Sequence, residues 1–588
     1  MELTKGIVFV FSLFTRKQNI HSVLLIILAL VSAGLDLIGL TAIIPVFAII
    51  FEPESLSEFP EIHLFLVDIG VSSRKSLILF SIISVSFLFL LKNIVSLVLT
   101  FLQQRFNYSV AVGLSERLLK EYYDRGLDFF KTNNSYLILR NLTTIPMEYS
   151  QQIVQSVMNI FSEGIIILII SLSIFFVNPI VLVISILAFL PAYLIFYYFS
   201  KKYMAYVNKQ RSETYVDVNN FLSRLIHGFE EVILSNAEIF FQDKYLRSFY
   251  KVGKYSAFQQ VFTVAPNKVM EFLAVLSLFA ISVYLIYAQT DTKELLITLS
   301  FFAAAAYRLI PTSNKLINAL SSLKSFNYVF EVYQDISHFE SPVELVDHLD
   351  QETNFLKLDS VISIDNLSYA YANSLNNALT NINLKISSGD VIGLIGSSGG
   401  GKTTLVNIIL GFYKPTSGTM DIDGINVHKQ MCKAWFSDLG YVRQNVYVFD
   451  LTIMENIALG VGLESIDVNK VKEALAGANL LEYCESLENG IYTLLEENGS
   501  NLSGGQRQRI AIARALYSDC SLLVFDEATS ALDAETEAQI TEEIRNLKNL
   551  GKTIIVVAHR HSSLKYCDHI YRLVDGSLVE KLSYQDIK

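Results

Sequence analysis

The chain has 588 residues, of which 52% are hydrophobic and only 18% are charged, and its formal net charge is −11. A mean hydropathy of +0.39 excludes a disordered chain and a wholly soluble protein of several domains. The negative balance excludes a nucleic-acid binder that relies on a basic surface. The apolar excess lies before about residue 320, so we expect a membrane domain there and a soluble domain after it.

Six apolar runs are long enough to cross a bilayer, because about 20 apolar residues in a helix span its hydrocarbon core. They cover residues 23–50, 77–102, 153–177, 180–199, 267–288 and 294–317. The first run is so long that we expect it to tilt or to kink near Pro45. It is also too long for a cleaved signal peptide, so we expect it to remain as a span.

The charges of the loops predict the orientation of the spans. Residues 103–150 and 201–260 are rich in Lys and Arg, whereas the loop between the first two spans is acidic. The positive-inside rule therefore places the two basic segments and both termini in the cytosol. Each basic segment is long enough for its flanking helices to continue below the membrane, joined by a short crossing helix that we expect near residues 134–142 and 225–235.

The acidic outside loop contains a mostly apolar stretch at residues 58–69. This stretch is typical of a short amphipathic helix on the membrane surface, and a packed loop is the alternative.

Ionisable residues inside the apolar runs are candidates for a binding site. Lys92, Lys268 and Arg308 are the cations, and Asp36 and Glu163 are the acids. A charge within the bilayer is costly, so each of these residues needs a partner of opposite charge or a water-filled cavity. The structural alternative pairs Lys92 with Asp36 or Glu163 and lets Lys268 reach the interface. Three cations on different helices nevertheless predict a surface for an anionic head group such as a pyrophosphate, which Arg308 can hold through two bonds.

Short β-branched runs that alternate with helical windows begin at about Val361 and predict an α/β domain. The expected division is a transmembrane domain at 1–320, a charged linker at 321–360 and a nucleotide-binding domain at 361–588. In the last of these, Gly396–Thr403 follows a strand-like run and precedes an apolar helix, as a phosphate-binding loop does. Its glycines let backbone N–H groups face a phosphate, Lys402 reaches the β- and γ-phosphates, and the Thr403 hydroxyl binds Mg²⁺.

Two further segments complete this pattern. Ser521–Glu527 is an apolar strand that ends in two carboxylates, which strand alternation points in different directions. We expect Asp526 to hold the hydrated Mg²⁺ and Glu527 to polarise the attacking water. Leu502–Gln506 places Ser503, a residue typical of helix N-caps, and two glycines at a helix start, which makes a second anion site. The chain already has a phosphate loop, so this second site is best explained as serving the nucleotide of another copy.

Together these segments and His559 resemble the ATPase domain of ABC transporters, and six spans followed by one such domain resemble an exporter-type half-transporter. The resemblance implies that Tyr371 stacks on adenine, that Gln444 contacts Mg²⁺ and that His559 contacts the γ-phosphate. It also implies that the loop Ser530–Asp533 crosses between paired ATPases. The implied ATP- and Mg²⁺-binding residues are Tyr371, Gly396, Ser397, Ser398, Gly399, Gly400, Gly401, Lys402, Thr403, Thr404, Gln444, Ser503, Gly504, Gly505, Gln506 and Asp526, with Glu527, Gln444 and His559 as the catalytic set.

Departures from the family pattern are confined to positions next to the chemistry. Arg443 stands where Pro is commoner, and Glu496 stands where Gly is commoner. Both lie where the ATPase meets the membrane helices, so they bear on coupling. Since Lys402, Ser503, Glu527 and His559 are all of the active type, two copies would make two competent sites, and we expect a symmetric homodimer.

The membrane half resembles PglK-type flippases of lipid-linked oligosaccharides, through residues 305–315, 36–45 and the outside stretch 58–69. By position, Arg308 and Lys92 match two of that family's basic cavity residues; at the third, Asn267 takes the position and Lys268 is its neighbour. The resemblance implies ATP-driven flipping of an anionic, lipid-linked glycan to the outer leaflet of a bacterial inner membrane. The partners would then be membrane lipids and a second copy, with no nucleic acid. Two alternatives stay open, an exporter of peptides, lipids or amphipathic drugs and an ATPase that regulates a partner membrane protein.

Overall fold

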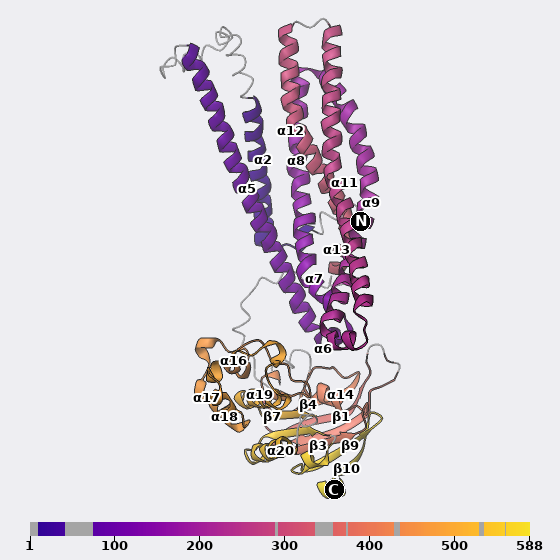
Figure 1. Cartoon of the computed structure of the whole chain (residues 1–588), viewed down its shortest axis with the longest axis vertical. Helices are drawn as coiled ribbons and strands as arrows, with labels where there is room; N and C mark the ends of the chain where they lie inside the picture. Colours follow the sequence, from indigo (N-terminus) through magenta and orange to yellow (C-terminus); the bar gives the residue numbers. More distant parts are fainter. Residues whose placement is uncertain are drawn as a thin grey trace. The chain divides into compact units, whose positions relative to one another are not determined.

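The computed structural model of the chain divides into two compact units, which are described separately (Figure 1). It describes residues 10–41, 74–288, 292–334, 357–371, 374, 376–427, 435–527, 534–558 and 560–587. The first unit comprises Met1–Arg125 and Phe129–Val346, and the second comprises Gly126–Asp128 and Asp347–Lys588.

The first unit is built from helices. They are α2 (Arg16–Thr41), α5 (Arg74–Asp124), α6 (Gly126–Thr132), α7 (Ser135–Glu148), the π-helix η2 (Tyr149–Val154), α8 (Gln155–Val177), α9 (Pro179–His227), α10 (Phe229–Leu234), α11 (Glu238–Tyr287), α12 (Thr292–Ser325) and α13 (Asn327–Gln334). The predicted apolar runs from residue 77 onward lie within these long helices. The first run is described only as far as Thr41, and Pro45 and the outside stretch 58–69 lie outside the described residues.

Four of the described segments are long and apolar enough to cross a membrane: Ile78–Asp124, Ser135–Val177, Pro179–Phe196 and Glu238–Tyr287. Large apolar side chains stay exposed along them, such as Phe87, Leu97 and Phe279. Apolar surface of this extent is unusual in a soluble monomer and is what a lipid-facing helix presents. Helix α5 continues past its apolar run to Asp124, and α9 continues to His227.

Local capping explains where the helices begin. The Asn178 side chain accepts hydrogen bonds from the backbone N–H groups of Ile180 and Val181, at 3.1 and 3.3 Å, so the chain turns directly from α8 into α9. Asn134 caps α7 in the same way, accepting from the N–H of Tyr136 at 2.9 Å.

The cap at Asn134 corrects one expectation. Residues 134–142, where we expected a short crossing helix, form the start of α7, and the short helix is α6, just before them. The division between the units falls inside α6, because Gly126–Asp128 belong to the second unit, where Leu127 packs against an apolar core. The second expected crossing segment, 225–235, contains the short helix α10.

Aromatic packing holds the junction of α7 and η2 against α13. Tyr149 is fully buried, donates its hydroxyl to the carbonyl of Val10 at 3.1 Å, and packs edge-on against Phe330 and Tyr333 of α13. It begins the π-helix, which follows Pro146 in α7; a proline and a π-turn are common causes of a change in helix direction.

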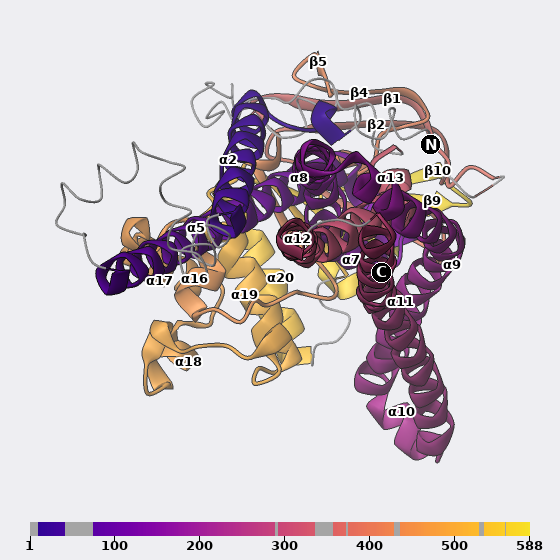
Figure 2. The same ribbon diagram turned by 90° about the horizontal axis from the view of Figure 1, so that it is seen from above.

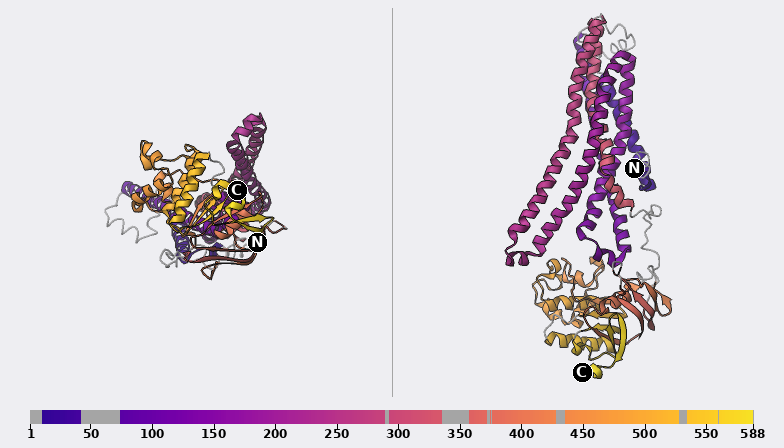
Figure 3. Two further views of the ribbon diagram at one scale, coloured as in Figure 1. Left: turned by 90° about the horizontal axis from the view of Figure 1, so that it is seen from below. Right: turned by 90° about the vertical axis from the view of Figure 1, so that its right-hand side faces the viewer.

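Helices α9 and α11 run side by side and are joined through α10. Figures 2 and 3 show this hairpin diverging from α7, α8 and α12, so that α10 lies at a projecting tip. The tip exposes Phe229, Leu234 and Ile239, the last two more than 80% exposed.

Two sheets organise the second unit. The larger has the order β10-β9-β3-β8-β7-β6, parallel except for β10, and the smaller is antiparallel with the order β2-β1-β4-β5. The strands are β1 (Val361–Tyr369), β2 (Leu379–Ser387), β3 (Val391–Gly396), β4 (Ser417–Ile422), β5 (Ile425–Asn426), β6 (Leu439–Val442), β7 (Leu522–Asp526), β8 (Thr553–Val557), β9 (His569–Val574) and β10 (Ser577–Leu582). The helices are α14 (Lys402–Ile409), α16 (Ile453–Ile457), α17 (Val468–Gly477), α18 (Leu481–Ser486), α19 (Gly504–Tyr517), α20 (Ala534–Asn549) and α21 (Tyr584–Ile587).

The central strands β7 and β8 are buried at every residue, and β3 is buried from Val391 to Ile395. A parallel strand covered on both faces requires such unbroken apolar runs, and the sequence supplies them. The carboxyl ends of β3 and β7 therefore lie at one edge of the sheet, where the phosphate-loop and carboxylate motifs follow them.

Candidate nucleotide site

The loop between β3 and α14 is shaped by its glycines. Gly396 has a φ of 153°, and a Cβ there would lie 2.2 Å from the carbonyl oxygen of Leu573. Gly401, with a φ of 100°, lies directly before α14 and close to the backbone of Ala378. Only glycine fits at these two positions, so the predicted phosphate loop takes its tight curve from β3 into the helix.

Lys402 lies inside this curve and is only 5% exposed. Its Nζ donates to the carbonyl oxygens of Gly396 and Ser397, at 2.8 and 3.0 Å. Burial lowers the pKa of Lys402, and the charges of Glu527 and Asp526 oppose that shift. Among the described residues, the hydrogen bonds of the ammonium group go to these two backbone carbonyls, an arrangement that leaves it able to turn to a phosphate oxygen.

The two carboxylates at the end of β7 occupy different environments. Asp526 is buried, and its Oδ2 accepts a hydrogen bond from the Tyr441 hydroxyl at 3.0 Å. Burial raises the pKa of Asp526, whereas the Tyr441 bond and the nearby Lys402 lower it. Glu527 is half-buried.

Glu527 has a left-handed backbone, with a φ of 50°. This conformation is uncommon and costly for a residue with a side chain, and such strain gathers at functional sites. Its N–H donates to the carbonyl oxygen of Val557 at 3.0 Å, which holds the turn against β8. Glu527 therefore has a backbone conformation different from that of Asp526, which ends strand β7.

These residues fit ATP and Mg²⁺. Lys402 and the backbone of the loop suit phosphate oxygens, and the exposed Thr403 side chain and Asp526 supply hard oxygen ligands. Among the described residues, no three His, Cys, Asp or Glu side chains gather to hold a metal ion by themselves. Mg²⁺ is ordinarily held by one or two protein groups together with the phosphates of its nucleotide. The two protein groups found here, Thr403 and Asp526, are therefore enough for an Mg²⁺ ion that arrives with ATP.

Tyr371 belongs to a small aromatic cluster. Its ring lies edge-on to Tyr413, with centroids 5.8 Å apart, and its hydroxyl is 2.8 Å from the Thr404 hydroxyl. Tyr371 is 37% exposed. The ring is therefore fixed beside the start of α14 and still presents apolar surface, as a base-stacking role requires.

The second anion site is built on the N-terminus of α19. The Ser503 side chain accepts from the N–H of Gln506 at 3.2 Å, and the Gln506 side chain accepts from the N–H of Ser503 at 2.8 Å. This reciprocal pair is a capping box, so the predicted N-cap is confirmed. At Gly504 a Cβ would have no neighbour within 4 Å, which leaves the helix start accessible.

The predictions for Gln444, His559 and the loop Ser530–Asp533 have still to be compared with the structure. Gln444 is exposed and follows β6. His559 and the loop Ser530–Asp533 lie outside the described residues.

Sequence reasoning missed a residue that joins elements next to these segments. Glu537 of α20 accepts hydrogen bonds from Ser563, at 3.2 Å, and also from Arg560 and Ser562. It therefore ties the helix after Ser530–Asp533 to the turn after His559. Its only sequence signal, a Glu on a charged helix, is not specific.

The three membrane cations lie on three different helices. Lys92 on α5 is half-buried, with Nζ 4.4 Å from the centre of the Phe89 ring, and Arg308 lies half-buried on α12. Lys268 on α11 is 66% exposed and pairs with Glu271 on its own helix at 3.0 Å.

One of the two partners considered for Lys92 in the structural alternative is engaged elsewhere. Glu163 pairs with Lys315 of α12, at 2.8 Å. The Asp36 side chain lies outside the described residues. Lys315 was not singled out from the sequence because it stands near the end of its apolar run, where a lysine is ordinary.

Comparison with known proteins agrees with this geometry. Residues 379–530 match the family model described as ABC transporter. The ATP-dependent lipid A-core flippase of Francisella novicida is 33% identical over 402 residues, which are 66% of this chain and 65% of that protein. The protein of the same name from Cupriavidus metallidurans is 32% identical over 367 residues, 62% and 60% of the two chains. The chain thus spans less than two thirds of the length of these relatives.

A solved structure shares the complete fold. It is described as a bacterial Atm1-family ABC exporter with ATP bound; it has a TM-score of 0.76 and 20% identity, over 97% of this chain and 96% of that one. The predicted fold class is thereby confirmed, and the family-model match over residues 379–530 supports the predicted ATPase and its two cofactors. The chain therefore has the fold of an ABC exporter in half-transporter form, a helical membrane domain followed by a domain that matches the ABC transporter family model.

Proposed function

We propose that two copies of this chain form an ATP-driven flippase for an anionic lipid. The cargo that we favour is a polyprenyl-pyrophosphate-linked oligosaccharide, moved from the inner to the outer leaflet of a bacterial inner membrane. In this proposal the ATPase domain and both termini are cytosolic.

ATP hydrolysis as the energy source is supported by the group formed by Lys402, Asp526 and Glu527. A buried ammonium held by loop carbonyls, next to two carboxylates with different backbone conformations, suits phosphate binding and water activation. We assign Glu527 to polarising the water, Gln444 to Mg²⁺ and His559 to the γ-phosphate.

The second copy is supported by the accessible start of α19. This helix N-terminus, at which Gly504 has space around it, can bind an anion. The phosphate loop of the same chain already serves that chain's own nucleotide, so the second anion site suits the nucleotide of another copy. In a head-to-tail pair, Ser503 of one copy would complete the nucleotide site of the other. The exposed apolar tip at α10 is a further surface that a second copy can cover.

A lipid cargo is supported by the relatives, which are named as lipid flippases, and by the exposed apolar flanks of the long helices. An anionic head group is supported by Lys92 and Arg308, two half-buried cations on different helices, with Lys268 as a third contact. The relatives' own cargo, lipid A-core, is the second candidate, because it is the lipid that their names print.

Reconstitution tests the proposal. The full chain is placed in liposomes that contain either a fluorescent polyprenyl-pyrophosphate oligosaccharide or a fluorescent lipid A-core. Loss of leaflet asymmetry with ATP and Mg²⁺ is then followed by an impermeant quencher. We expect movement of the first lipid, which Glu527→Gln abolishes and which Lys92→Gln with Arg308→Gln reduces severalfold while ATP turnover continues. Arg247→Gln, which removes an exposed cation of α11, is the matched control and leaves movement unchanged.

Each result has a defined reading. Movement of lipid A-core alone would replace the favoured cargo with the second candidate. ATP turnover with movement of neither lipid would overturn the flippase proposal.

A further inference from the structure

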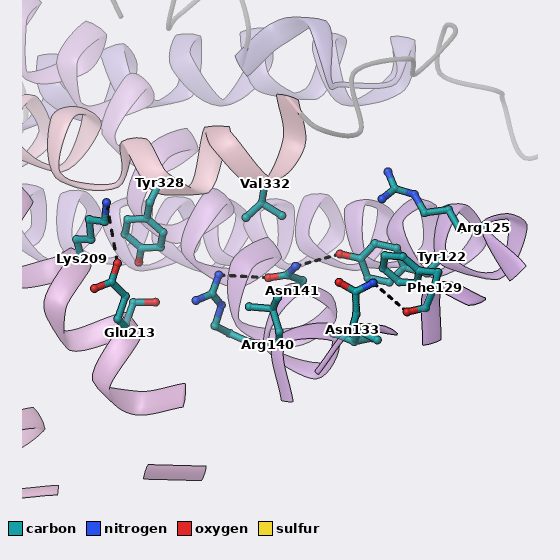
Figure 4. A pocket seen from close by; sticks show the side chains of 13 residues that line it. Tyr122, Arg125, Phe129, Asn133, Arg140, Asn141, Lys209, Glu213, Tyr328 and Val332 are labelled. Carbon is teal, nitrogen blue, oxygen red and sulfur yellow. Dashed lines mark hydrogen bonds and ion pairs between the residues drawn. The ribbon is translucent and has the colours of Figure 1, made fainter. Parts of the chain in front are cut away.

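A cavity of about 420 Å³ lies in the first unit, well away from Lys92 and Arg308 in sequence. It is lined by the end of α5, by α6 and α7, by the middle of α9 and by α13 (Figure 4). Its volume is within the range of sites for small molecules. Apart from α13, the segments that form it belong to residues 103–150 and 201–260, which the positive-inside rule places on the cytosolic side.

Its charged lining is predominantly positive. Arg125, Arg140 and Lys209 come from three different segments, and Glu213 is the acid among the described lining residues. Figure 4 shows Lys209 and Glu213 toward one end, Arg140 in the middle and Arg125 toward the other end. The positive charge is therefore spread along the cavity, which suits an extended anion better than a single carboxylate.

Arg140 is incompletely satisfied. Its Nη2 donates to Asn141 next to it at 3.3 Å, and its Nε is buried with no hydrogen-bond partner among the described residues. A buried guanidinium N–H without an acceptor is costly, and the group has a fork geometry that phosphate oxygens satisfy.

Acidic neighbours offset part of this charge, because the Arg125 Nε pairs with Glu121 at 3.2 Å and Glu148 interacts electrostatically with Arg140. Lys209 and Glu213 are 4.0 Å apart and both more than half exposed, so this ion pair is weak. Asn141 donates to the Tyr122 hydroxyl at 3.1 Å, and the Arg125 guanidinium lies 5.3 Å from the centre of the Phe129 ring. The lining is thus fixed by neighbours, with polar groups at hand for additional hydrogen bonds.

We propose that this cavity binds a ligand that carries two linked phosphate groups, separately from the nucleotide site. Arg140 and Lys209 bind one phosphate, and Arg125 lies along the cavity for the other. The chemistry is shared by a soluble diphosphate and by the head group of a lipid diphosphate. The proposal is independent of the proposed function, since it concerns binding at a site that neither the cargo cations nor the ATP site includes.

The test uses inorganic pyrophosphate and the full chain in phosphatidylcholine nanodiscs. A Lys402→Ala background removes pyrophosphate binding by the phosphate loop. We expect one pyrophosphate per chain by calorimetry. Arg140→Gln with Lys209→Gln should weaken the affinity about tenfold or more, because each removes a charge-assisted hydrogen bond. Lys244→Gln with Arg247→Gln, the same change in charge on the exposed face of α11, should have no effect.

Glu213→Gln distinguishes a binding effect from misfolding. It removes the acid of the lining and should therefore tighten pyrophosphate binding, whereas a misfolded variant would bind more weakly. Repeating the titration in nanodiscs that contain a polyprenyl diphosphate separates the two sources. Competition identifies the lipid head group as an occupant, and its absence identifies a soluble ligand. Absence of saturable pyrophosphate binding, equal losses in the two double variants, or weaker binding by Glu213→Gln would overturn the proposal.

Discussion

The hydroxyl of Tyr441 controls the environment of Asp526. Burial raises the pKa of Asp526, and the 3.0 Å bond from Tyr441 is the first influence that lowers it. The two residues meet because β6 and β7 are adjacent parallel strands, with Tyr441 in register with Val524. The bond therefore favours the charged form of Asp526, which is the form that the proposed Mg²⁺ role requires.

Tyr441→Phe should raise the pKa of Asp526, because it removes a hydrogen bond to the carboxylate. A higher pKa means that the carboxylate is lost earlier as the pH falls, so the acid limb of the ATPase pH profile should move to higher pH. The loss of kcat/KM at neutral pH should be about two- to tenfold, as expected for one hydrogen bond. Tyr447→Phe is the control, because the Tyr447 ring is 54% exposed. An unshifted acid limb in Tyr441→Phe would contradict this role.

Glu537 makes a pH-dependent contribution to the stability of the ATPase domain. Burial alone would raise its pKa, but the hydrogen bonds from Ser562, Arg560 and Ser563 lower it overall. A carboxyl whose folded-state pKa is lowered stabilises the fold at pH values above its unfolded pKa. That stabilisation fades as the pH falls through the folded pKa.

Glu537→Ala should therefore lower the melting temperature of the ATPase domain at pH 7, by about 2–4 °C for each kcal/mol lost. The difference from the unsubstituted protein should shrink as the pH is lowered below about 4.5, the ordinary pKa of a glutamate. Glu542→Ala on the same helix is the control, because its ion pair with Arg545 is a surface pair. Scanning fluorimetry of the full chain across pH provides the measurement, and a difference that grows as the pH falls would refute the assignment.

At the scale of elements, local signals were predictable and distant pairings were not. The strand, glycine loop and helix around Gly396–Thr403 follow from neighbouring residues, since each glycine and the apolar run beside it act locally. The Tyr441–Asp526 hydrogen bond joins residues far apart in the chain, and no hydrophobic periodicity in the sequence predicts it. Residues 134–142 form the start of the longer helix α7 rather than a separate short helix, because the Asn134 side chain caps α7 and no turn residue ends it before Glu148.

The N-terminus of α19 allows capping and anion binding to be separated. Ser503→Ala removes the cap and should cost about 0.5–2 kcal/mol of stability. Ser503→Asp keeps a good capping residue and suits the helix dipole, but it places a negative charge where the phosphate should lie.

Thermal melting and ATP turnover of the two variants should therefore diverge. Ser503→Ala should melt below the unsubstituted protein, whereas Ser503→Asp should melt at or above it and yet lose more ATPase activity. Turnover by Ser503→Asp equal to that of the unsubstituted protein would show that this helix start does not meet a nucleotide phosphate.

At the scale of the whole molecule, the proposed head-to-tail homodimer would make each ATP site from two chains. Lys402 and Glu527 would come from one copy and Ser503 from the other. Lys402→Ala dimers and Ser503→Asp dimers should both be inactive, since each has two broken sites. A mixed dimer of these two variants gathers both substitutions in one site and leaves the other site intact.

Co-expression with two different affinity tags isolates the mixed dimers. If one intact site can hydrolyse ATP by itself, we expect the mixed dimers to regain up to about half of the unsubstituted ATP turnover. If turnover needs both sites, we expect the mixed dimers to trap one ATP per dimer. A mixture of Lys402→Ala with Glu527→Gln is the matched control. These two residues belong to the same half of a site, so that mixed dimer has one defect in each site and should stay inactive. A gain in the control, or none in the first mixture by either measurement, would mean that Lys402 and Ser503 do not share a site across two chains.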